Sequence, residues 1–106
     1  MAARYYCADS ENGDHIDGPS EDALFMLISD LDDADNTFVV IQPDEDDPAW
    51  FASVAALDEG GYEVVRRDTT RGQHEVTTVT SINQIAKDLT IWMAGRNHPD
   101  RHTSTF

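Results

Sequence analysis

Four short segments rich in β-branched and aromatic residues constrain this fold more than any other feature of the sequence. They cover residues 37–42, 49–57, 62–68 and 74–80. Between the second and the third, Asp58-Glu59-Gly60-Gly61 has the composition of a tight hairpin turn, and strands joined in this way pair antiparallel. The alanine-rich segment 49–57 also fits a helix, but the hairpin turn that follows it favours a strand.

Two amphipathic helices are expected, one before and one after these strands. The first covers about residues 20–31, where Ser20 can act as the N-cap. The second covers residues 81–94, where Ser81-x-x-Gln84 is a capping box and Gly95 a C-cap. Apolar residues recur with helical spacing in both, at Leu24, Leu27, Ile28 and Leu31, and at Ile82, Ile85, Ala86, Leu89, Trp92 and Met93.

The N-terminal part adds one short segment to this pattern. Residues 3–8 fit an edge strand, and the polar residues 9–18 are expected to form a loop. The sequence therefore predicts an α+β domain over residues 1–96, with the element order β-α-β-β-β-β-α. We expect an antiparallel sheet of four to five strands with two helices packed on one face. Residues 97–106 lack periodicity and are expected to form a loose C-terminal tail.

Charge is distributed very unevenly along the chain, whose formal net charge is −14. Residues 1–59 hold sixteen acids and one base, a net charge of −15, whereas residues 60–106 hold five acids and six bases, a net charge of +1. A surface this negative repels phosphate groups, so direct binding to nucleic acid or to an anionic membrane is not expected. A basic protein or a cation is the natural partner.

The acids gather in two clusters that flank the apolar run 38–41. Such clusters are either solvated loops that aid solubility or a recognition surface for a basic partner. Trp50 follows the second cluster, and it fits either a core residue or an exposed apolar anchor for that partner. The predicted partner-binding residues are Asp30, Asp32, Asp33 and Asp35 in the first cluster, Asp44, Glu45, Asp46 and Asp47 in the second, and Trp50.

Catalytic and metal-binding motifs are not found in the sequence. Cys7 is the single cysteine, which rules out an internal disulfide and fits a reducing cytoplasm, and no apolar run approaches the roughly 18 residues of a membrane span. The acids starting at Asp30 and at Asp9 do not match a calcium loop, and Pro99 interrupts the pair His98 and His102. We therefore expect neither an enzyme nor a bound cofactor or metal.

The last helix carries a resemblance to a known family. Its pattern, Ile82-x-x-Ile85-x-x-x-Leu89-x-x-Trp92-x-x-Gly95-x-x-x-Pro99, and the order of the elements resemble the immunity proteins of bacterial polymorphic toxins. The closest pattern is that of the family found beside cytidine-deaminase toxins that act on DNA. The resemblance implies a cytoplasmic inhibitor whose acidic face occludes the basic substrate groove of a deaminase or nuclease toxin. The alternative is an acidic interaction module without inhibitory function, such as a secretion chaperone or a regulatory adaptor.

Overall fold

A glycine-rich turn sets the direction of the central strands. Gly60 and Gly61 both have positive φ angles, 98° and 80°, which glycine adopts without the steric cost that a side chain brings. In the computed structural model, which describes residues 6–44 and 48–95, this turn joins β4 (Trp50–Ala56) to β5 (Tyr62–Asp68). The segment that also fitted a helix is therefore a strand, as predicted.

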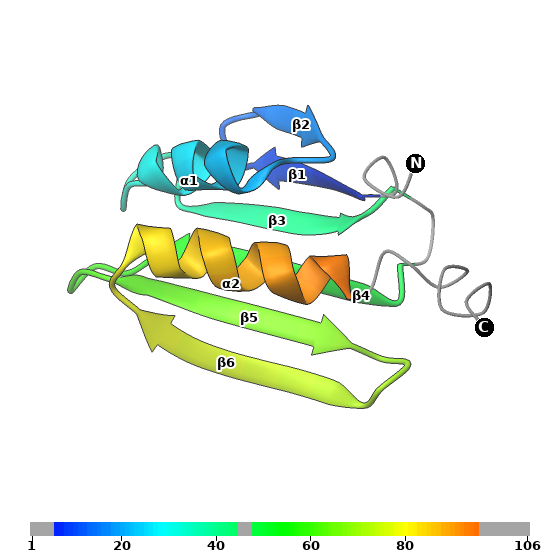
Figure 1. Cartoon of the computed structure of the whole chain (residues 1–106). Helices are drawn as coiled ribbons and strands as arrows, with labels where there is room; N and C mark the ends of the chain where they lie inside the picture. Colours follow the sequence, from blue (N-terminus) through cyan, green and yellow to red (C-terminus); the bar gives the residue numbers. More distant parts are fainter. Residues whose placement is uncertain (1–5, 45–47, 96–106) are drawn as a thin grey trace.

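The described strands form one sheet in the order β2-β1-β3-β4-β5-β6 (Figure 1). Every neighbouring pair is antiparallel. The strands other than β4 and β5 are β1 (Tyr6–Ser10), β2 (His15–Asp17), β3 (Phe38–Pro43) and β6 (Gln73–Val79). The predicted α+β class and antiparallel sheet are confirmed.

The sheet is larger than predicted, with six strands in place of four to five. The additional strand is β2, which lies in the segment 9–18 that we expected to be a loop. Its three residues are too few for sequence alternation to reveal, but Ile16 packs against the core while its neighbours face away. Backbone hydrogen bonds from Ser10 N to Asp14 O and from Gly13 N to Ser10 O close the turn that pairs β2 with β1.

Two helices, α1 (Glu21–Ser29) and α2 (Ile82–Ala94), lie side by side on one face of the sheet (Figure 1). The Oγ atoms of Ser20 and Ser81 accept hydrogen bonds from the backbone N–H groups of residues 23 and 84, so both predicted N-caps are present. The side chain of Gln84 donates to Asp88, 2.8 Å away. The capping box expected at Ser81 is therefore half formed.

The core lies between the helices and the sheet face toward which they pack. Leu24 and Ile28 from α1 and Leu89 and Met93 from α2 are at most 1% exposed. They meet alternate residues of the central strands, namely Val39, Ile41, Ala52 and Val54. No described element covers the opposite sheet face, where Phe38 and Val76 are 38% and 52% exposed.

Neither described helix is long and apolar enough to cross a bilayer. The predicted tail, residues 97–106, lies outside the described part of the chain.

Candidate protein-binding site

The two acidic clusters lie at opposite ends of β3. Asp30–Asp35 precedes the strand and Asp44 follows it, while Glu45, Asp46 and Asp47 lie outside the described residues. Because a strand of six residues spans about 20 Å, Asp44 is separated from the first cluster by the length of β3. The expectation that the acids around residues 38–41 form one recognition surface stays a prediction, because of the second cluster only Asp44 is described.

Three connecting segments meet at the end of the sheet where β3 begins. The turn between β1 and β2 is tied to the segment after α1, because Asn12 N donates to Asn36 Oδ1, 3.2 Å away. The segment after α1 is tied to the end of β4, because Ala56 N donates to Thr37 O, 2.9 Å away. The antiparallel pairing of β4 with β5 adds the turn 57–61 to the same end (Figure 1).

These segments bring eight acids to one end of the molecule, which we call the acidic end. None of the Lys and Arg residues in the described part of the chain lies in these segments. The C-terminus of α1 also points here with no basic residue in its last turn, but α2 begins at the same end, so the partial charges of the two helix termini oppose each other. The acidic end comprises Glu11, Asp14, Asp30, Asp32, Asp33, Asp35, Asp58 and Glu59.

Two of the eight acids hold the acidic end together. Asp32 Oδ1 accepts hydrogen bonds from the backbone N–H groups of residues 34, 35 and 36, at 2.8–3.2 Å, and these bonds lower the pKa of its carboxyl group. Glu11 Oε1 accepts from the side chain and backbone of Thr37 at 2.7 and 2.8 Å, which lowers the pKa of Glu11. Asp32 and Glu11 therefore fix the shape of the surface from which the other carboxylates project.

Phe38 is an exposed aromatic residue next to these acids. It is the first residue of β3 and faces the open side of the sheet, with 38% of its surface exposed. Phe38 lies in the predicted strand 37–42 and was not among the predicted partner-binding residues. The sequence carries no signal for it, because residues 38–41 are all apolar; in the structure Val39 and Ile41 are buried and Phe38 points the other way.

Trp50 is buried, with 7% of its surface exposed, so it cannot serve as the exposed anchor that we included in the predicted site. The reason is its position in β4, where it shares the helix-facing side with Ala52 and Val54. Its ring packs edge-on between Tyr6 and Trp92, with ring centroids 6.1 and 5.5 Å away. The core alternative for Trp50 is therefore the correct one.

Comparisons with protein-family models, curated proteins and solved structures find no match for this chain. The resemblance to immunity proteins therefore stands as a proposal that depends on the fold, the charge and the acidic end.

Proposed function

We propose that this protein is a cytoplasmic immunity protein that binds and inhibits a toxin acting on nucleic acid. The observation that supports it is the acidic end, where eight acids gather without a Lys or Arg in the described segments that form it. A toxin of this class, a deaminase or a nuclease, presents a basic groove for the phosphates of its substrate. Carboxylates held at fixed positions by Asp32 and Glu11 can take the place of those phosphates and block the groove.

Charge and apolar contact have separate roles in this proposal. The carboxylates of the acidic end steer the encounter and raise the association rate, to about 10⁸ M⁻¹s⁻¹ or more at low salt. An aromatic side chain desolvated on binding contributes more to the lifetime of a complex than charges at its rim do. Phe38 is the described residue next to the acidic end that fits this role, because it is aromatic, exposed and on the rigid start of β3.

Co-expression with the product of the neighbouring gene tests the proposal. We expect that gene product to arrest growth when expressed alone, and this protein to restore growth and to co-purify with it. Phe38→Ala should weaken both the rescue and the capture, whereas Val76→Ala, which truncates an exposed residue of the same sheet face on β6, should leave them unchanged. Capture without rescue would support the secretion chaperone or adaptor instead.

A further inference from the structure

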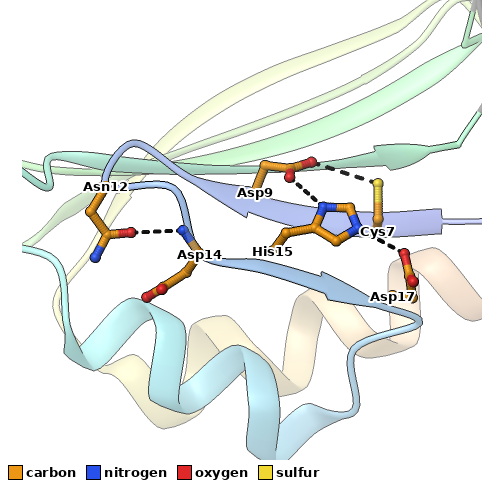
Figure 2. A network of polar contacts seen from close by, with 6 residues as sticks. All are labelled: Cys7, Asp9, Asn12, Asp14, His15 and Asp17. Carbon is orange, nitrogen blue, oxygen red and sulfur yellow. Dashed lines mark hydrogen bonds and ion pairs between the residues drawn. The ribbon is translucent and has the colours of Figure 1, made fainter.

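A cysteine, a histidine and two aspartates face one another at the edge of the sheet, beside the β1–β2 turn that forms part of the acidic end. Cys7 and Asp9 lie on β1, and His15 and Asp17 lie on β2. The register pairs Asp9 with His15 and Cys7 with Asp17, and residues two apart in a strand share a face. All four side chains therefore gather on one side of the two strands (Figure 2).

Three of these side chains present metal-ligating atoms to one another. Asp9 lies between the other two, with Oδ1 2.5 Å from His15 Nδ1 and Oδ2 3.6 Å from Cys7 Sγ (Figure 2). One ligand atom from each of the three residues lies within 4.8 Å of the others. Bonds of about 2.0–2.3 Å to zinc place the ligands of a tetrahedral site roughly 3.3–3.7 Å apart. The separations between these ligand atoms are therefore close to those that such a site requires.

The fourth side chain holds the histidine in place. Asp17 Oδ1 is 2.8 Å from His15 Nε2, on the side of the ring opposite the nitrogen that faces Asp9. Histidines that bind a metal through one nitrogen commonly donate the other N–H to a carboxylate, which fixes the tautomer and the ring orientation. Asp17 supplies that contact, so the cluster contains a positioning residue as well as three ligands.

We propose that Cys7 Sγ, Asp9 and His15 Nδ1 bind one divalent transition metal ion, with Asp17 as the positioning residue. A thiolate and an imidazole in the same set favour zinc over calcium or magnesium, which prefer oxygen ligands. The side chains of His15 and Asp9 are about half exposed, so a fourth ligand can come from solvent. The bound ion links the three-residue edge strand β2 to β1 and stabilises that edge.

The charges around Cys7 fit a cation site. Burial raises the pKa of the Cys7 thiol to about 11, and the negative charges of Asp9, Asp44 and Asp17 contribute to the shift. The thiol is therefore protonated at neutral pH, and a bound metal ion has to displace its proton. The same three carboxylates attract a divalent cation to this edge.

Sequence spacing does not reveal this site. The two strands join through a turn whose length sets the register, and the register places residue 9 opposite residue 15 and residue 7 opposite residue 17. Because we expected residues 9–18 to form a loop, Cys7 and His15 had no predicted reason to meet.

Titration of the full chain with Co²⁺, a spectroscopic substitute for Zn²⁺, tests the proposal. We expect one ion per chain, a near-ultraviolet band from thiolate-to-cobalt charge transfer, and loss of that band when Zn²⁺ displaces Co²⁺. Cys7→Ser should abolish the band, and His15→Gln should abolish it or weaken Co²⁺ binding more than tenfold. Asp17→Asn should weaken binding about 10–100-fold, as expected for a residue that orients a ligand.

Two control variants distinguish metal binding at this site from metal binding by other histidines of the chain. His74→Gln changes an exposed histidine on β6, and the double variant His98→Gln with His102→Gln removes the histidine pair considered from the sequence. Both should keep the band and the affinity. Circular dichroism of each variant confirms that the fold is retained. Binding without a thiolate band, or a band that His15→Gln leaves unchanged, would overturn the proposal.

Discussion

Asp32 and Asp33 are adjacent acids of the same type with different roles. Asp32 accepts three backbone hydrogen bonds and shapes the segment between α1 and β3, whereas the side chain of Asp33 makes no hydrogen bond or ion pair within the described residues. The sequence predicts both as members of one acidic cluster. It cannot separate them, because the difference depends on which carboxylate the backbone of the turn surrounds.

Replacing Asp32 and Asp33 one at a time separates the effect of the lost backbone hydrogen bonds from the effect of the lost negative charge. Asp32→Ala should lower the melting temperature, because three backbone N–H groups lose their acceptor, while Asp33→Ala should leave it nearly unchanged. Both variants remove one negative charge, so Asp33→Ala is the matched control. Thermal unfolding followed by circular dichroism measures the effect, and equal melting temperatures for the two variants would show that the turn does not depend on Asp32.

The pKa of the His15 side chain should lie above its ordinary value. Hydrogen bonds to Asp9 and Asp17, together with their charges, raise its pKa above 6.5, because these carboxylates stabilise the protonated ring. Its contribution to stability is therefore fully present below about pH 6.5, the value for an unfolded chain, and is lost as pH rises through the folded-state pKa.

NMR titration of the His15 ring protons in metal-free protein measures this shift. Asp9→Asn should bring the pKa of His15 down toward 6.5, because it removes the charge that contacts Nδ1. A His15 pKa at or below 6.5 in the unmodified protein would show that the contacts seen between β1 and β2 do not persist in solution.

The elements themselves follow local sequence rules more closely than their arrangement does. Both N-caps, the central strands and the hairpin at residues 58–61 were predictable, because each depends on residues adjacent in sequence. Strand β2 was not, because its three residues carry too short a pattern. The gathering of Glu11 with Asp32, and the separation of Asp44 from both, follow from antiparallel register that the sequence does not specify.

Helix α2 offers a test of the packing at element scale. Trp92 is 8% exposed, contacts the ring of Trp50 edge-on and donates a hydrogen bond to Gln73 Oε1, 3.2 Å away. Trp92→Ala should lower the free energy of unfolding by about 3–5 kcal/mol, the usual range for a large aromatic residue in a core.

The preceding residue of α2 provides the control. Ile91 is 62% exposed, so Ile91→Ala should change the free energy of unfolding by no more than about 0.5 kcal/mol. Urea titration of the three proteins measures both effects. A loss below about 1 kcal/mol for Trp92→Ala would mean that its ring does not contribute to the core as described.

At the scale of the whole molecule, the charge is asymmetric in space as well as in sequence. The carboxylates of the acidic end repel one another, which lowers the stability of the folded state, and added salt weakens this repulsion. A surface selected only for solubility has no need to concentrate acids in segments without Lys or Arg. The concentration of acids at one end is therefore the feature that the proposed recognition of a basic partner explains.

The proposed recognition of a basic partner by the acidic end is tested most directly by two triple variants of equal net charge. For each, the rate of association with the captured partner is measured across a salt series. Each raises the formal net charge from −14 to −11, one by changes within the acidic end and the other by changes outside it. The acidic-end variant carries Asp33→Asn, Asp58→Asn and Glu59→Gln, and the control carries Glu21→Gln, Asp22→Asn and Asp44→Asn.

We predict that stopped-flow association at low salt is slowed several-fold or more in the acidic-end variant, with a flatter dependence on salt and little change in the dissociation rate. The control should associate nearly as fast as the unmodified protein. Equal association rates and equal salt dependence for the two triple variants would contradict the account. The association rate would then depend on the net charge alone and not on the position of the acids in the molecule.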